Sequence, residues 1–132
     1  GIRILLAEDN DLNAEIAIEW LNVQGAQVVR VNDGKAALDA VETSKPETFQ
    51  AILMDIRMPQ MNGLEAARRI RSLSRPDART IPIIAMTANA FQEDVQAALE
   101  AGMTGFVPKP IDVNQLYREL HNAIMHNKQK NP

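Results

Sequence analysis

The sequence contains no cysteine, few aromatic residues and no long apolar run. Without cysteine, the chain can form neither disulfides nor thiolate metal sites. Aromatic residues make up 4% of the 132 residues and apolar residues 45%, which favours a core of Ile, Leu, Val, Ala and Met. No apolar run approaches the roughly 20 residues that span a membrane, and no secretory signal opens the chain. A net charge of −3 gives no sign of the basic face that nucleic-acid binding needs.

Short apolar runs alternate with helical patterns along the whole chain. Runs without strict polar alternation are typical of strands buried on both faces of a parallel sheet. The expected strands are 2–7, 27–31, 51–54, 81–86 and 105–107, and the expected helices are 11–24, 35–43, 63–73, 91–101 and 112–126. Five βα units in strict alternation predict a doubly wound α/β domain.

The ends of the expected helices carry capping residues. Side chains that cap helix N-termini stand at Asn10 or Asp11, Asp33, Asn62, Asn89 and Asp112. Gly25 and Gly102 stand where two helices should end. Residues 74–80 are expected to form a polar loop around Pro76. We expect one domain over residues 1–126, followed by a flexible tail or linker at 127–132.

Polar residues follow four of the five predicted strands. They are Glu8 and Asp9 after the first strand, Asp55 after the third, Thr87 after the fourth and Lys109 after the fifth. Each has an ordinary structural explanation when taken singly. Ligands of open parallel sheets bind beyond the carboxyl ends of the strands, so the joint pattern predicts a site there.

The residue types in this set favour phosphoryl transfer. Three adjacent carboxylates repel one another, and a hard divalent cation such as Mg²⁺ relieves that repulsion. Lys109 could pair with Asp55 and keep it ionised as a nucleophile, and the Thr87 hydroxyl could donate to a phosphoryl oxygen. A metal, an amine and a hydroxyl around a carboxylate are what in-line phosphoryl transfer requires.

Four segments resemble the signatures of response regulator receiver domains, in order and at that family's spacing. They are LLAEDN at 5–10, MDIRMPQMNG at 54–63, MTANA at 86–90 and VPKP at 107–110. The resemblance covers essentially the whole chain. It implies a flavodoxin-like fold, with a five-stranded parallel sheet in the order 2-1-3-4-5 and five helices.

The resemblance also implies a role for each site residue. Asp55 would be the phosphoacceptor, and Asp9 and Asp55 would ligate Mg²⁺ together with the backbone carbonyl of Arg57, while Glu8 would act through water. Thr87 and Lys109 would contact the phosphoryl group. A separate set of expectations concerns conformation: Phe106 matches the aromatic residue that switches with Thr87, and the Lys109–Pro110 bond resembles the family's cis peptide.

Two stretches, EDNDLN at 8–13 and MTANA at 86–90, resemble receivers within hybrid histidine kinases. This implies a phosphorelay in which a histidine kinase or histidine phosphotransfer domain is the partner, with no direct contact to nucleic acid or membrane. The domain would be a switch and not an enzyme, catalysing only its own phosphorylation and dephosphorylation. It would be cytoplasmic, alone or as part of a membrane-anchored hybrid kinase. A dimer through the face formed by residues 91–126 is also compatible with the family.

The helix at 11–24 carries an apolar arc wider than a core-facing helix needs. One face of this helix is shared by Ala17, Trp20, Leu21 and Gln24, and the arc is extended sideways by Leu12, Ile16 and Val23. The surplus would dock a partner helix beside Asp55, or it would lie under neighbouring loops.

Other functions fit the residues less well. A phosphatase of the haloacid dehalogenase type would use Asp9 and Asp11, but the Thr expected after them is absent. A Ca²⁺ loop starting at Asp9 fails because Ala14 stands where Gly is needed and Trp20 where Glu is needed. The acids after the first strand oppose a flavin module. A receiver-like scaffold that binds partners without phosphorylation remains open.

Overall fold

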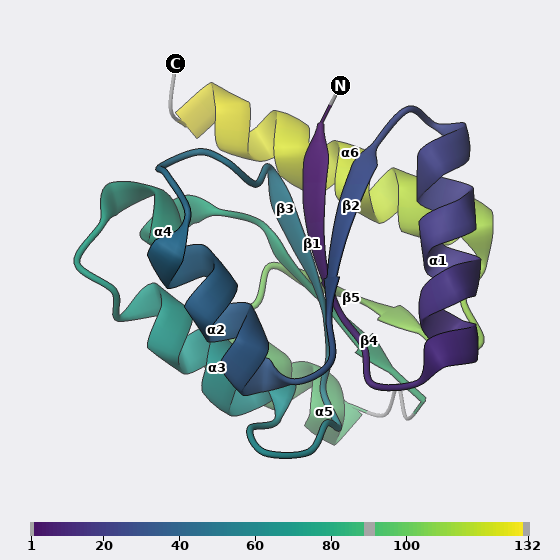
Figure 1. The fold of residues 1–132 in the computed structure, drawn as a ribbon, viewed down its shortest axis with the longest axis horizontal. Helices are drawn as coiled ribbons and strands as arrows, with labels where there is room; N and C mark the ends of the chain where they lie inside the picture. Colours follow the sequence, from purple (N-terminus) through teal and green to yellow (C-terminus); the bar gives the residue numbers. More distant parts are fainter. Residues whose placement is uncertain (1, 89–91, 131–132) are drawn as a thin grey trace.

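The computed structural model describes residues 2–88 and 92–130. Its five strands form one parallel sheet in the order β2-β1-β3-β4-β5 (Figure 1), which confirms the predicted fold class and strand order. The strands are β1 (Arg3–Ala7), β2 (Gln27–Val31), β3 (Ala51–Asp55), β4 (Ile83–Thr87) and β5 (Gly105–Pro108).

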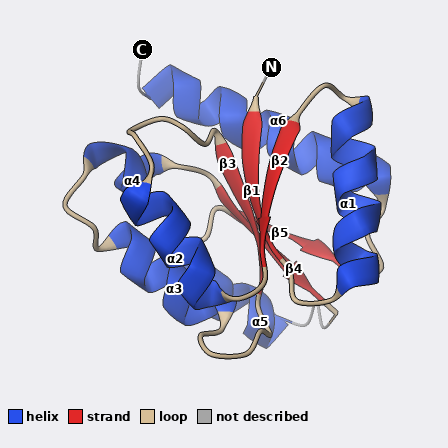
Figure 2. Ribbon diagram, in the orientation of Figure 1, coloured by secondary structure: helices blue, strands red, loops and turns tan. Residues whose placement is uncertain are grey.

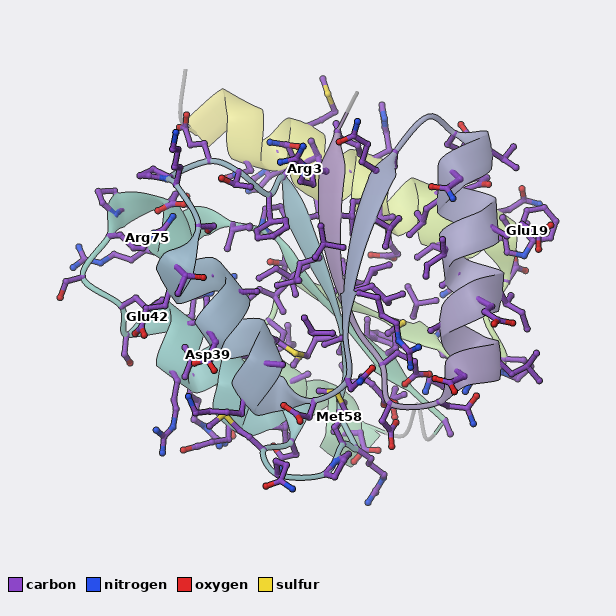
Figure 3. All side chains as sticks on the ribbon, in the orientation of Figure 1. Arg3, Glu19, Asp39, Glu42, Met58 and Arg75 are labelled. Carbon is purple, nitrogen blue, oxygen red and sulfur yellow. The ribbon has the colours of Figure 1, made fainter. Side chains whose placement is uncertain are left out.

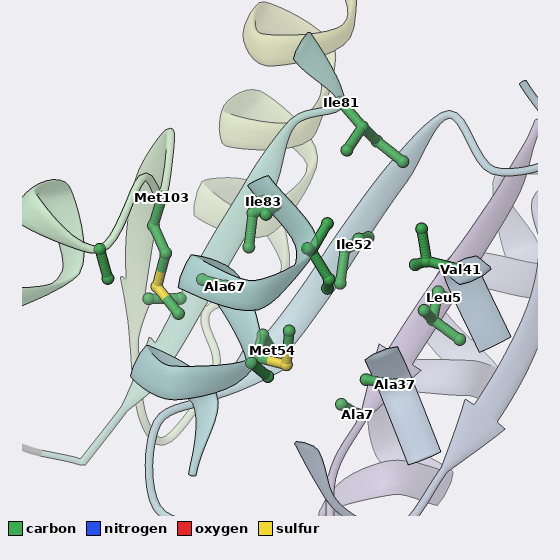
Figure 4. Packing of buried hydrophobic residues seen from close by; sticks show 14 of the residues in the cluster. Leu5, Ala7, Ala37, Val41, Ile52, Met54, Ala67, Ile81, Ile83 and Met103 are labelled. Atoms are coloured by element: carbon green, nitrogen blue, oxygen red, sulfur yellow. The ribbon is translucent and has the colours of Figure 1, made fainter. Parts of the chain in front are cut away.

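Helices cover both faces of the sheet (Figure 2). One face is covered by α1 (Asp11–Val23) and α6 (Val113–Lys130). The other face is covered by α2 (Gly34–Thr43), α3 (Gly63–Arg71), α4 (Pro76–Thr80) and α5 (Gln92–Glu100). Successive strand residues point to opposite faces, so the sheet separates two apolar cores. Figure 4 shows one of them, in which Leu5, Ile52 and Met54 lie close to residues of α2 and α3.

The expectation that every strand is buried on both faces is correct for β1, β3 and β4 but wrong for the two edge strands, β2 and β5, of which β5 has only Val107 buried. All five residues of β3 and of β4 are buried, as are the last four of β1. β2 lies at the edge of the sheet, where its one strand partner among the described residues is β1, so Gln27 and Val29 are exposed.

The described residues contain six helices where five were expected, because residues 76–80 form the short helix α4. Pro76 starts this helix, where its fixed φ and missing N–H are tolerated. Arg75 pairs with Asp77 at 2.8 Å and donates to the carbonyls of Val41 and Ser44 at the end of α2. Figure 3 shows Arg75 beside this part of the molecule. These tertiary contacts give the segment a defined structure that its polar composition did not suggest.

Most of the predicted caps are present. The side chain of Asn10 accepts from the N–H of Asn13 at 2.9 Å, so Asn10 is the cap and Asp11 is the first helical residue. Further side-chain caps are Asp33, Asn62 and Asp112, whereas Asn89 lies outside the described residues. Gly25 and Gly102 have φ of 84° and 96°, in the left-handed region that ends helices.

The last helix runs to Lys130, past its expected end at 126. The division into a domain and a linker at 127–132 therefore remains a prediction, with 127–130 helical in the structure. β1 begins and α6 ends at the same edge of the sheet (Figure 1), and Ile2 and Met125 line one cavity of about 550 Å³ there. Among the described residues, no helix has the length and apolar character to cross a bilayer.

Candidate functional site

The predicted site residues meet at the opposite edge, where the strands end. Glu8 and Asp9 directly follow β1, Asp55 and Thr87 end β3 and β4, and Lys109 directly follows β5. In Figure 3 this edge is the lower one, where Met58 lies in the loop after β3. The parallel arrangement brings together residues that are far apart in the sequence.

Lys109 joins two carboxylates at the centre of the site. Its Nζ lies 2.8 Å from Glu8 Oε1 and 2.8 Å from Asp55 Oδ2. The backbone N–H of Lys109 donates to the carbonyl of Thr87 at 2.7 Å, which ties the residue to the end of β4. The Lys109–Pro110 peptide bond is cis. The pairing with Asp55 was expected from the sequence, but the second bond to Glu8 was not.

The three acids form a cluster suited to a cation. Ligand atoms of Glu8, Asp9 and Asp55 all lie within 4.8 Å of one another. Glu8 and Asp55 are buried whereas Asp9 is exposed, so the cluster opens to solvent on one side. Glu8 Oε2 is buried and accepts no hydrogen bond from the described residues. A buried carboxylate oxygen without a donor fits a hard divalent cation or its bound water.

Burial and charge shift the ionisation of this cluster. Burial raises the pKa of Glu8 to about 7, and the neighbouring Asp55 adds to the rise, while Lys109 opposes it. Burial opposes the charge of Lys109, but its hydrogen bonds to Asp55 and Glu8 raise the pKa of the amine overall. Lys109 is therefore charged at neutral pH, and Glu8 is poised between its two forms.

We expect the metal-free domain to lose stability as the pH rises from about 4.5 to about 7. In the unfolded chain Glu8 has its ordinary pKa of 4.5, so between 4.5 and about 7 the folded state binds more protons. The contribution of Glu8 to the free energy of unfolding is therefore fully present below pH 4.5, and it is lost by about pH 7, where Glu8 of the folded domain ionises. In EDTA, the unfolding midpoint should be lower at about pH 8 than at about pH 5, by roughly 5 °C.

Glu8→Gln should remove most of this pH dependence. Glu19→Gln is the matched control, because Glu19 is exposed on the outer side of α1 (Figure 3). Equal pH dependence in the two variants would show that Glu8 is not its source.

The loop after β3 approaches the backbone of Asp55 closely. The N–H of Arg57 donates to Asp55 Oδ1 at 3.2 Å, while the Arg57 side chain points to solvent. A Cβ on Gly63 would lie 2.3 Å from the carbonyl oxygen of Asp55, so only glycine fits there. Likewise, Gly34 donates to the carbonyl of Met61 at 3.0 Å, and a Cβ on Gly34 would lie 2.2 Å from that oxygen.

Sequence reasoning did not single out Gly34 and Gly63 for this purpose. Both follow a helix cap, in the dipeptides Asp33-Gly34 and Asn62-Gly63, which is a weak signal. Their role depends on backbone contacts between distant segments, which a single sequence does not reveal.

Thr87 and Phe106 lie on neighbouring strands. Thr87 is 4% exposed, and its Oγ1 lies 3.5 Å from Asp94 Oδ2 of α5. Phe106 is half-buried and packs against the core on the α2–α5 side. The two side chains thus connect the site edge with the α5–β5 region.

The sequence is similar to receiver domains over most of its length. The family model described as "Response regulator receiver domain" matches residues 4–121. The chain is 39% identical over 124 residues to hybrid signal transduction histidine kinase I of Dictyostelium discoideum, covering 92% of this chain and 7% of that protein. It is 40% identical over 114 residues to the osmosensing histidine protein kinase SLN1 of Saccharomyces cerevisiae, covering 84% of this chain and 9% of that protein. It therefore spans a small part of these relatives.

Solved structures are similar as well. One is the receiver domain of a sensor histidine kinase from Pseudomonas aeruginosa PAO1, with a magnesium ion coordinated in its active-site cleft. It has a TM-score of 0.84 and 39% identity, covering 95% of this chain and 98% of that one. Another is the chemotaxis protein CheY4 of Vibrio cholerae, with a TM-score of 0.83 and 25% identity, covering 92% of this chain and 98% of that one.

Proposed function

We propose, from the premise that this chain belongs to the response regulator receiver domain family, that Asp55 accepts a phosphoryl group from phosphohistidine and thereby switches the domain. The observation that carries the proposal is the contact of Lys109 Nζ with both Asp55 and Glu8, at 2.8 Å each. A buried carboxylate that accepts a hydrogen bond from an amine, beside a cation-binding cluster, has the surroundings that a nucleophile for phosphorus needs.

The acidic cluster suits Mg²⁺. Asp9 and Asp55 would hold the ion, together with the backbone carbonyl of Arg57, and Glu8 would act through a bound water. The buried Glu8 Oε2, which has no hydrogen-bond donor in the described part of the chain, supports this assignment. When bound, Mg²⁺ offsets the negative charge that gathers on the phosphoryl oxygens.

Each residue of the site has a step to perform. An oxygen of Asp55 attacks phosphorus, and a P–O bond forms as the P–N bond to the donor imidazole breaks. The leaving imidazole nitrogen takes a proton from solvent. Lys109 can then transfer one of its hydrogen bonds from Asp55 to a phosphoryl oxygen while keeping Glu8. The Thr87 hydroxyl donates to a second phosphoryl oxygen.

The switch would follow from the movement of Thr87. Its contact with Asp94 is 3.5 Å, a long hydrogen bond that rotation toward the phosphoryl group would break. The space left by Thr87 would let Phe106 repack. The surface formed by α5, β5 and α6 would change as a result. Dimerisation through this surface would be one way for the change to transmit the signal.

Receiver domains are a family of signalling switches. For this chain we propose that catalysis is limited to its own phosphoryl transfer and to hydrolysis of its own acyl phosphate. We also propose a cytoplasmic setting, in which the partner is a histidine kinase or a histidine phosphotransfer domain. The histidine kinases among the relatives, one of them named as a hybrid kinase, support this choice of partner.

The outer face of α1 is the proposed docking surface for that donor. The exposed apolar residues of α1, termed here the α1 stripe, are Leu12, Ile16, Trp20 and Val23, with exposed fractions of 65%, 41%, 42% and 69%. The helix begins next to Asp9, so a partner helix packed along the stripe would bring a histidine near Asp55. Contiguous exposed apolar side chains on a helix are typical of helix–helix docking.

Ile16→Glu should slow transfer from a phosphorylated histidine phosphotransfer domain by roughly tenfold or more, because a charge replaces a central apolar contact. Phosphorylation by acetyl phosphate should be unchanged. Met125→Glu is the matched control, since Met125 is 44% exposed on α6 and lines the cavity at the edge of the sheet opposite to Asp55. Equal slowing in both variants would contradict the docking assignment.

Intact mass measurement tests the proposed function. The domain should gain one phosphoryl group from acetyl phosphate with Mg²⁺, gain none in EDTA, and lose the group in hydroxylamine, as an acyl phosphate does. Peptide mapping should locate it at Asp55. No gain from acetyl phosphate or from several phosphohistidine donors would favour a scaffold that binds partners without phosphorylation.

A further inference from the structure

Arg30, near the carboxyl end of β2, reaches the loop after β1. Its Nε and Nη2 both donate to the backbone carbonyl of Glu8, at 3.1 and 2.9 Å. Its Nη1 lies 2.8 Å from Asp11 Oδ1, where the Arg30 side chain is 23% exposed and that of Asp11 is 85% exposed. An ion pair with so exposed a partner contributes little. The fork on the carbonyl is the more sheltered contact.

This fork acts on the peptide that links two of the acids. The carbonyl of Glu8 belongs to the planar peptide unit between Glu8 and Asp9. Two donors on its oxygen restrain rotation of that unit, which sets the directions in which both side chains leave the backbone. The N–H of Glu8 is also held from β2, because it donates to the carbonyl of Val31 at 3.1 Å. β2 therefore holds the backbone of Glu8 on both sides.

We infer that Arg30 is a positioning residue for the acidic site: it orients the Glu8–Asp9 peptide so that both carboxylates converge with Asp55 on a divalent cation. The inference rests on the proposed function of that site. Arg30 acts through the backbone and not by ligating the ion.

The guanidinium has a second effect of opposite sign. Its positive charge lies beside the acids and repels a cation, so removing it both loosens the loop and relieves repulsion. Lysine separates the two effects, because it keeps the charge but lacks the planar two-donor fork. Salt separates them as well, because it screens the repulsion but not the loss of orientation.

Calorimetric titration with Mg²⁺ tests the inference at low and high salt. Arg30→Lys should weaken Mg²⁺ binding by roughly tenfold at both salt concentrations, a typical effect of losing a residue that supports metal ligands. Arg30→Gln should lose less affinity than Arg30→Lys at low salt, because repulsion is relieved. At high salt it should lose about as much as Arg30→Lys.

Arg3→Lys is the matched control. Arg3 donates from Nε and Nη2 to Gln27 Oε1, at 3.3 and 3.0 Å, so it makes the same kind of fork across the same pair of strands. It lies at the opposite edge of the sheet (Figure 3). Its replacement should change the affinity for Mg²⁺ by less than about twofold.

Two results would overturn the inference. In the first, the unmodified domain binds Mg²⁺, and Arg30→Lys binds it with an affinity within about twofold of that value. This result would leave the proposed function intact. The other is no Mg²⁺ binding by the unmodified domain, which would overturn the proposed function as well. Circular dichroism in EDTA checks that each variant is folded. If Arg30→Lys is not, Arg30→Gln decides alone, because its affinity at high salt must then fall by roughly tenfold.

Discussion

Asp55→Asn is expected to abolish phosphorylation, with incorporation from acetyl phosphate falling by more than about a thousandfold. The amide is neutral and a poor nucleophile, so the attack on phosphorus loses its acceptor. Lys109 would keep its contact with Glu8 but would lose the charge of its second partner. The measurement is intact mass after incubation with Mg²⁺ and acetyl phosphate.

Asp33→Asn is the matched control for this prediction. Asp33 follows β2 near the same edge of the sheet, and its side chain caps α2 by accepting from the N–H of Ala36 at 2.7 Å. Asparagine caps helices about as well as aspartate, so this variant should be phosphorylated normally. Hydroxylamine-sensitive phosphoprotein in Asp55→Asn at the normal rate would overturn the assignment of the acceptor.

Lys109→Met should destabilise the metal-free domain by about 3 kcal/mol near pH 8, because it leaves two buried carboxylates without their cation. The loss should be smaller below about pH 6, where Glu8 can take a proton, since burial raises its pKa to about 7. Added Mg²⁺ should restore much of the stability, because it replaces the missing positive charge. Phosphoryl transfer should stay slow, since Mg²⁺ does not replace the amine that donates a hydrogen bond to a phosphoryl oxygen.

Denaturant unfolding at two pH values, with and without Mg²⁺, measures these effects. Lys35→Met is the matched control, because Lys35 pairs with Asp39 at 2.7 Å on the surface, with the two side chains 59% and 51% exposed. Such pairs contribute less than about 1 kcal/mol. If the two variants were equally stable at pH 8, the pairing of Lys109 with the buried acids would contribute no more to stability than the surface pair does.

The sequence could predict that the site residues lie together, because a parallel sheet places the ends of its strands at one edge. Once the apolar runs were interpreted as parallel strands, the polar residues after them had to meet at one edge. The structure has Asp55 and Lys109 in contact at this edge, although the two residues are far apart in the chain. Composition and periodicity were enough for this step, since it needs only strand direction and not side-chain packing.

Other features depended on packing that periodicity does not encode. Trp20 shares a helical face with Ala17 and Leu21 by spacing, yet it is 42% exposed, because the buried side of α1 is formed by Ala14, Ala17 and Leu21. A wide apolar arc does not indicate which part of it meets the sheet. The helix α4 has five residues, fewer than a periodic pattern needs. The contacts of Arg30 with Glu8 likewise join residues 22 positions apart, with no motif linking them.

The position of the two ends of the fold has a consequence for how such a domain can be combined with others. β1 begins and α6 ends at one edge, and the acids and Lys109 lie at the other. A flanking chain attached at either end would leave from the side remote from the chemistry. Changing its length would alter how far the reactive edge can travel toward a donor, without altering the reactive edge itself. The effective local concentration of the donor, and not the geometry of the acidic site, would then set how often donor and acceptor meet.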